Sequence, residues 1–153
     1  MKKIIIILVF VLYVVQGMAQ IFKGDDGIYY TSNGILFQGT YVEYFNNDSI
    51  KTKMEFKNGT LNGYVNVYFQ NGNIHEIQNY KLGKKDGLWL LYNENGQLIS
   101  EANYKNNKKH GRWFIYDEQG KLRTEMYYKN GQKKYSWKQY DNIGNLLSEQ
   151  TFK

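Results

Sequence analysis

The sequence contains no cysteine and no proline among its 153 residues. Without cysteine, the chain has no disulfide bonds, no thiol nucleophile and no thiolate ligand for a metal. Histidine is scarce, since only His75 and His110 are present. A metal centre or a catalytic triad needs several convergent side chains. We therefore expect both histidines to be surface residues and predict no metal site.

Motifs for phosphate or cofactor binding are also missing. No glycine-rich loop opens a helix, and no helix is predicted after the first 19 residues. Glu101, Glu125 and Glu149 recur at a fixed spacing and would lie about 10 Å apart on neighbouring units of a sheet. This separation is slightly beyond the carboxylate spacing of glycosidases, so the glutamates are expected to pair with lysines or to cap indoles. The sequence predicts a protein that is not an enzyme and has no cofactor.

A long hydrophobic run occurs only at the N-terminus. Two lysines precede the apolar residues 4–15, and Gly17, Met18 and Ala19 follow them. This order is typical of a secretory signal peptide that is cleaved after Ala19. A membrane anchor is the alternative, but the run is short against the roughly 20 residues that span a bilayer. We predict that residues 1–19 are a signal peptide and that the rest is exported, to the periplasm or the medium.

The remaining sequence repeats itself every 24 residues, from about Gly39 to Phe152, without an insertion. A fixed period of this length indicates stacked copies of one supersecondary unit. Five copies fit between these two residues. The clearest series are Gly39, Gly63, Gly87 and Gly111; Tyr44, Tyr68, Tyr92, Tyr116 and Tyr140; Ile50, Ile74, Leu98, Leu122 and Leu146; and Phe56, Tyr80, Tyr104, Tyr128 and Phe152.

Each repeat is predicted to be one β-hairpin. In the third repeat, residues 88–92 and 97–104 are rich in apolar and aromatic side chains and are flanked by turn residues. Between them, residues 93–96 suit a type I turn closed by a left-handed glycine. The predicted fold is all-β: an elongated, single-layer antiparallel sheet of five hairpins arranged as a meander. Such a sheet has no deep core, so we expect neighbouring repeats to stabilise one another.

The predicted turn sets the pairing of the two strands, and with it the face on which each side chain lies. Tyr92 would lie opposite Leu98, and Leu90 would lie opposite Ser100. Side chains two residues apart share a face. The expected packing face of the third repeat carries Leu88, Leu90, Tyr92, Leu98, Ala102 and Tyr104.

Tryptophan occurs once in each of the last three repeats, and the same pairing places it on the opposite face, across from the recurring glutamates. Indoles mixed with carboxylates are typical of a half-exposed sheet surface. The plainer interpretation of the tryptophans is structural. Alternatively, aromatic rings at a regular spacing form a platform for a glycan or a lipid headgroup. The three residues are Trp89, Trp113 and Trp137.

Lysines collect in the connections between hairpins, at one edge of the predicted sheet, and acidic residues collect in the hairpin turns at the other edge. A basic edge attracts the phosphates of lipids or lipopolysaccharide, or an acidic partner. Lysines in such positions also solvate loops and keep strand edges from pairing with other chains. The candidate binding residues are Lys84, Lys85, Lys108 and Lys109, accompanied by Lys81 and Lys105.

The pattern G-x-W-x-x-Y-x-x-x-G-x-L, followed by a glutamate, an aromatic residue and K-N-G-x-x-x-G, is clearest in residues 87–131. It resembles the bacterial variant of the MORN repeat. The resemblance implies antiparallel hairpins laid side by side in an elongated sheet. It also implies roles for the family: many bacterial relatives are labelled as antitoxins of toxin–antitoxin systems, and eukaryotic relatives are linked to membrane association and scaffolding.

Residues 20–38 are similar to half of a degenerate repeat, and we predict that they cap the array formed by residues 39–153. The last strand is predicted to be an exposed edge, able to recruit a partner strand or a second copy. Two functions remain open. The first is a scaffold that binds an unidentified protein, with an antitoxin-like or inhibitory role; the second is a binding module for membrane lipid or envelope glycan. Nucleic acid is not expected as a partner of an exported protein.

Overall fold

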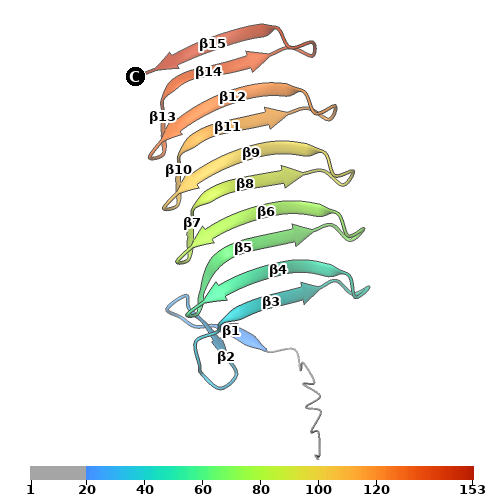
Figure 1. The fold of residues 1–153 in the computed structure, drawn as a ribbon, viewed down its shortest axis with the longest axis vertical. Helices are drawn as coiled ribbons and strands as arrows, with labels where there is room; N and C mark the ends of the chain where they lie inside the picture. The colour runs from blue at the N-terminus through green and yellow to red at the C-terminus, as the bar shows by residue number, and fades with distance from the viewer. Residues whose placement is uncertain (1–19) are drawn as a thin grey trace, which may run out of the picture.

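The computed structural model describes residues 20–153, and the predicted signal peptide, residues 1–19, lies outside the described residues. In the described part, every regular element is a β-strand. Ten long strands form one antiparallel meander in which each pairs with the next along the chain (Figure 1). Figure 1 shows the hairpin turns along one side of the sheet and the connections between hairpins along the other. The predicted all-β hairpin array is confirmed.

Five hairpins make up the sheet. The third shows the predicted turn, because the Gly96 N–H donates to the Asn93 carbonyl (2.9 Å) and Gly96 has a left-handed φ of 78°. This turn fixes the start of the second strand in each repeat. The hairpins are β3 (Gly39–Tyr44) with β4 (Ile50–Lys57), β5 (Thr60–Tyr68) with β6 (Ile74–Lys81), β8 (Gly87–Tyr92) with β9 (Leu98–Lys105), β11 (Gly111–Tyr116) with β12 (Leu122–Lys129), and β14 (Tyr135–Tyr140) with β15 (Leu146–Phe152).

The connections between hairpins are two-residue turns. In one of them, Leu82 and Gly83 have φ values of 49° and 74°, and Lys81 pairs with Lys84 across the turn. Two consecutive left-handed residues give the turn whose twist matches that of the flanking strands. Short strands follow three of the turns: β7 (Lys84–Lys85), β10 (Lys108–Lys109) and β13 (Gln132–Lys133).

The predicted strand pairing is wrong by one residue along most of each hairpin. Tyr92 lies opposite Leu98, as predicted, but a β-bulge then adds one residue to the second strand. Leu90 therefore lies opposite Glu101 instead of Ser100. An extra residue in one strand moves every later side chain to the other face. The same shift occurs in all five hairpins.

This shift changes the face on which the tryptophans lie. Trp89 is opposite Ala102, and its ring contacts that of Tyr104. Leu88 alternates with Trp89 and lies on the other side of the sheet. The predictions that Leu88 shares a face with Tyr104, and that Trp89 lies across from a glutamate, are therefore wrong. We call the face that carries the three tryptophans the ladder face, and the other the open face.

The most buried side chains all lie on the ladder face. Phe56, which residues 20–38 cover, is 4% exposed, and Tyr128, within the repeat array, is 7% exposed. No large side chain in residues 20–153 is fully buried. Packing between neighbouring repeats therefore replaces a central core, as expected for a linear array. The other buried apolar residues are Phe37, Val65 and Met126.

Residues before the first hairpin pack against the end of the ladder face. Strands β1 (Ile21–Lys23) and β2 (Tyr29–Thr31) form a separate two-stranded sheet. The rings of Tyr29 and Phe37 lie 4.8 and 5.3 Å from the ring of Phe56, between centroids. The Tyr29 N–H also donates to the Gly59 carbonyl (2.8 Å). These contacts cover the N-terminal end of the ladder face, while β3 and β15 occupy the two ends of the strand order.

Candidate functional site

A continuous ladder of aromatic rings runs along the ladder face through the last four hairpins. One ring at the end of each second strand alternates with one tryptophan from the next first strand. Neighbouring ring centroids are 5.1 to 5.4 Å apart, a distance at which tilted and edge-on rings attract each other. In order, the rings are Tyr80, Trp89, Tyr104, Trp113, Tyr128, Trp137 and Phe152.

Each indole of this ladder is fixed by a hydrogen bond to the preceding repeat. The Nε1–H of Trp89 donates to the Asn79 carbonyl at 3.0 Å, and that of Trp113 donates to the Asn103 carbonyl at 2.9 Å. Trp137 makes the equivalent bond, at 3.3 Å. Because the polar atom of each ring is satisfied by the backbone, the tryptophans join neighbouring repeats to one another.

Lysines from the connections cover the indoles. The Nζ atoms of Lys85, Lys109 and Lys133 lie 4.2, 4.3 and 4.2 Å from the centroids of the three successive tryptophans. An ammonium group at this distance over an aromatic face is attracted by it. Sequence reasoning missed the third of these lysines, although the 24-residue step from Lys109 leads directly to it.

The candidate binding residues therefore divide into two groups. Lys84 and Lys108 are exposed at the sheet edge, whereas Lys85 and Lys109 are half-buried against the tryptophans. The structure brings each tryptophan together with two aromatic rings and one ammonium group. It does not present the three indoles as a free stacking platform.

The recurring glutamates lie on the open face, away from the tryptophans. Glu101 accepts a hydrogen bond from the Tyr116 hydroxyl (2.7 Å), and Glu125 accepts one from the Tyr140 hydroxyl (3.5 Å). Glu149 pairs with Lys138 at 3.9 Å. The sequence predicts that these residues pair with lysines or cap indoles. Glu149 makes the lysine pair, and none of the three caps an indole, because the β-bulge moves them to the other face. Two of the three instead join a repeat to the next through a tyrosine.

Burial and one of these hydrogen bonds change the acidity of Tyr116. Desolvation first, and then the hydrogen bond to Glu101, raise the pKa of Tyr116 to about 12. Burial also raises the pKa of Tyr80 and of Tyr104 on the ladder face. All three phenols therefore stay neutral at physiological pH and act as hydrogen-bonding or packing groups.

The open face carries an apolar stripe that no other part of the described chain covers. It runs beside the hairpin turns, where a tyrosine at the end of each first strand faces an isoleucine or leucine at the start of the second. Its side chains are half-buried or exposed, with Tyr44 at 45% and Leu146 at 51%. The tyrosine stripe, as we call it, consists of Tyr44, Tyr68, Tyr92, Tyr116, Tyr140, Ile50, Ile74, Leu98, Leu122 and Leu146.

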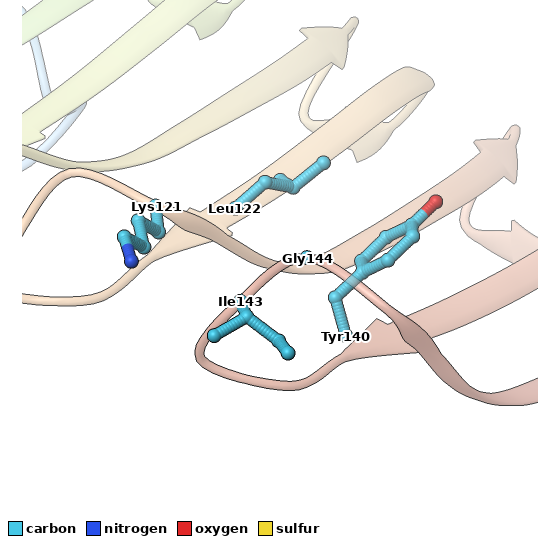
Figure 2. A pocket seen from close by; sticks show the side chains of 5 residues that line it. All are labelled: Lys121, Leu122, Tyr140, Ile143 and Gly144. Carbon is cyan, nitrogen blue, oxygen red and sulfur yellow. The ribbon is translucent and has the colours of Figure 1, made fainter.

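A shallow hollow lies within this stripe, between the fourth and fifth hairpins. Figure 2 shows the side chains of Leu122, Tyr140 and Ile143 around it, with Lys121 at its rim. Its volume is about 460 Å³, and Gly144 completes its lining. The lining offers one ammonium group and no carboxylate or imidazole, so the hollow suits an apolar side chain of a partner better than a reaction.

The two histidines lie in different repeats, His75 in β6 and His110 between β10 and β11, and they have different neighbours. The ring of His75 lies 4.3 Å from that of Phe69, between centroids. His110 accepts a long hydrogen bond (3.4 Å) at Nδ1 from the Asn130 N–H. Within residues 20–153, no three histidine, aspartate or glutamate side chains gather closely enough to hold a metal ion.

No helix in the described residues is long and apolar enough to cross a membrane.

Comparison with known proteins identifies the repeat. A family model described as the MORN repeat variant matches the chain four times, over residues 37–58, 61–82, 85–106 and 109–130. Each match begins at the repeat position that Lys85 and Lys109 occupy. It ends just past the aromatic residue near the end of the second strand of the hairpin. The four matches cover the first four hairpins, and the fifth follows them at the same 24-residue step. No curated protein matches the chain.

Proposed function

Because the chain belongs to the MORN repeat variant family, which matches more than half of its length, we propose that it is a non-enzymatic scaffold that binds another protein. The binding surface in this proposal is the tyrosine stripe of the open face. A partner that is held in this way could also be inhibited, which is the role that an antitoxin-like protein would have.

The exposure of the stripe is the observation that supports this proposal. The ladder face buries its aromatic rings against neighbouring repeats, lysine side chains and residues 20–38. The open face leaves tyrosine, isoleucine and leucine side chains in one continuous row. Monomeric proteins seldom expose a large contiguous apolar surface without a partner for it. Tyrosine is also enriched at the centre of protein interfaces.

The alternative function, a module that stacks lipid headgroups or glycans on its tryptophans, has less support. Stacking requires an accessible ring face, and each indole already contacts two rings and one ammonium group. The exposed lysines are a separate surface with a different chemistry, at the opposite edge of the sheet from the stripe.

Binding through the stripe is tested with arginine substitutions at three exposed positions: Tyr44→Arg, Ile74→Arg and Leu146→Arg. A matched control places arginine at three exposed apolar positions outside the stripe, Phe22, Ile35 and Leu82, which are 49%, 65% and 67% exposed. Each chain is immobilised and incubated with native extract, and bound proteins are identified by mass spectrometry. A partner of the stripe is captured by the wild type and the control, and is lost from the triple variant. A protein captured equally by all three chains contradicts the proposal.

Export is part of the same proposal and rests on the order of residues 1–19. The expected product of processing begins at Gln20, so the intact mass of the protein recovered from its native source should be that of residues 20–153. Recovery of a chain that still carries residues 1–19 would contradict export by a cleaved signal peptide.

A further inference from the structure

The connections between hairpins form a strongly basic edge. Four segments, residues 57–62, 81–86, 105–110 and 129–134, contain ten of the 20 basic residues of the chain and one of its 14 acidic residues. The rest of the chain holds ten basic and 13 acidic residues, so the charge is unevenly distributed. We call these four segments the lysine edge. They lie on the side of the sheet that carries β7, β10 and β13 in Figure 1.

The positive charges of this edge are largely uncompensated. In the described residues, the two ion pairs are Arg123 with Asp117 and Lys138 with Glu149, and neither lies at the lysine edge. The one carboxylate there, on Asp86, accepts a hydrogen bond from a backbone N–H (3.2 Å). Like charges gathered on one edge add their potentials and attract a counter-charge from solution.

The charges are also evenly spaced and partly fixed in place. Each repeat contributes two strands, so equivalent lysines in neighbouring repeats are about 9.6 Å apart. Lys85, Lys109 and Lys133 are held over indole rings, and Lys81, Lys105 and Lys129 stand exposed at the start of successive turns. A row of ordered cations loses less conformational entropy on binding than flexible ones.

A hollow gives this edge a place for one anionic group. It lies between the third and fourth hairpins, and its volume is about 570 Å³. Lys105, His110 and Arg112 line it together with the single carboxylate of Asp86 and the amide of Asn103. Arginine binds carboxylate or sulfate groups through two parallel hydrogen bonds. The Asn103 amide donates one N–H to the Arg112 carbonyl at 2.7 Å and keeps a second N–H donor.

We propose that the lysine edge binds a linear polysaccharide that carries carboxylate or sulfate groups. The chain of the polysaccharide follows the edge from repeat to repeat, and one of its anionic groups enters the hollow at Arg112. A straight row of cations fits a partner whose charges recur along one line. A membrane surface is a poorer fit, because peripheral binding to lipid also uses apolar side chains that enter the bilayer, and the turns of the edge expose only one large apolar side chain, Leu82.

Single-stranded nucleic acid is the other linear polyanion, and its bases bind by stacking on open aromatic faces. The tryptophans beside this edge are covered by lysines and neighbouring rings. Carboxylate and sulfate groups on a sugar chain are instead bound by positive charges and hydrogen-bond donors, and the lysine edge supplies both. This surface is separate from the tyrosine stripe, so the proposal does not depend on the proposed function.

The test measures binding of the full chain to heparin and to polygalacturonate by calorimetry, with neutral dextran, anionic phosphatidylglycerol vesicles and single-stranded DNA as comparison ligands. One variant combines Lys81→Gln, Lys105→Gln and Arg112→Gln. The control combines Lys51→Gln, Lys53→Gln and Lys121→Gln, which removes the same net charge from exposed residues away from the edge.

The proposal predicts that at least one of the two charged polysaccharides binds and that dextran does not. The edge variant should lose about tenfold or more in affinity, while the control loses less than about threefold, because three direct contacts are removed in one case and only distant charge in the other. Equal losses in the two variants, no binding of either charged polysaccharide, or tighter binding of vesicles or DNA would overturn it. Circular dichroism shows whether both variants keep the wild-type fold.

Discussion

Neighbouring residues in β8 should contribute very differently to stability, because they lie on opposite faces of the sheet. Trp89 contacts the rings of Tyr80 and Tyr104 at 5.4 and 5.2 Å, donates a hydrogen bond of 3.0 Å, and lies 4.2 Å from the ammonium group of Lys85. Leu88 is 37% exposed on the open face. The sequence-based pairing predicted the reverse, with Leu88 packed and Trp89 at the surface.

The expected cost of Trp89→Ala is about 3–5 kcal/mol, the usual range for removing a packed tryptophan. The separate contributions agree with this range: about 0.5–1.5 kcal/mol for each of two aromatic contacts, about 1 kcal/mol for the hydrogen bond, and about 0.5–1 kcal/mol for the ammonium group over the ring. Leu88→Ala truncates a partly exposed side chain and should cost about 1 kcal/mol, because Leu88 buries only part of its apolar surface on folding.

Urea unfolding followed by far-ultraviolet circular dichroism measures both changes. This signal does not depend on the number of tryptophans, so the two variants can be compared directly. The shift of the midpoint should be at least twice as large for Trp89→Ala as for Leu88→Ala. An equal shift, or a larger one for Leu88→Ala, would refute the assignment of the two faces and with it the β-bulge that produces them. Trp89→Phe, which keeps a ring but loses the donor, should fall between the two.

Two further predictions concern the backbone, and one concerns pH. Gly63 has a φ of 120°, and an added Cβ would lie 3.1 Å from the Cβ of Glu55, so Gly63→Ala should destabilise the fold by roughly 1 kcal/mol more than Gly72→Ala, where φ is also positive but nothing lies within 4 Å. Tyr135 has a φ of 56° at the position that is glycine in earlier repeats. The free energy of unfolding, measured with urea, should therefore be about 1 kcal/mol higher for Tyr135→Gly than for Tyr135→Ala, the reverse of the usual order in a strand. Because the folded state raises the pKa of Tyr116 from 10.0 to about 12, its contribution to stability is complete below pH 10 and is lost as the pH rises from 10 to 12. The Tyr116→Phe variant should lack that part of the alkaline loss of stability, and its absorbance titration at 295 nm should lack one late-ionising phenol; an unchanged titration would contradict the assignment.

The hairpins, their number and their order could be predicted from the period, because a 24-residue step without insertions leaves one structure for every copy. The turn at residues 93–96 was also predictable, since Gly96 and its equivalents provide the left-handed residue that the turn requires. The candidate lysines were found for the same reason, as members of a series in the connections. In each case the information is local and is repeated several times along the chain.

The faces of the strands could not be predicted in this way. A bulge adds one residue beyond the turn and leaves no pattern in the sequence, because both faces of each hairpin carry aromatic and apolar side chains. The stacking of Tyr104 on Trp89 and Trp113 favours the bulged pairing, and those partners come from three different strands. The exposed tyrosine stripe and the basic hollow at Arg112 follow from the same shift.

The sequence alone therefore determined the class of fold, the repeating unit and the edge at which the lysines gather, since each depends on residues within one 24-residue copy. Only the tertiary structure decided which side chains form the aromatic ladder and which remain exposed. These outcomes depend on the register between the two strands of each hairpin, where one residue exchanges the two faces. Packing of Tyr104 on Trp89 within one hairpin and on Trp113 of the next supports that register, and the second of these contacts exists only once the repeats are stacked.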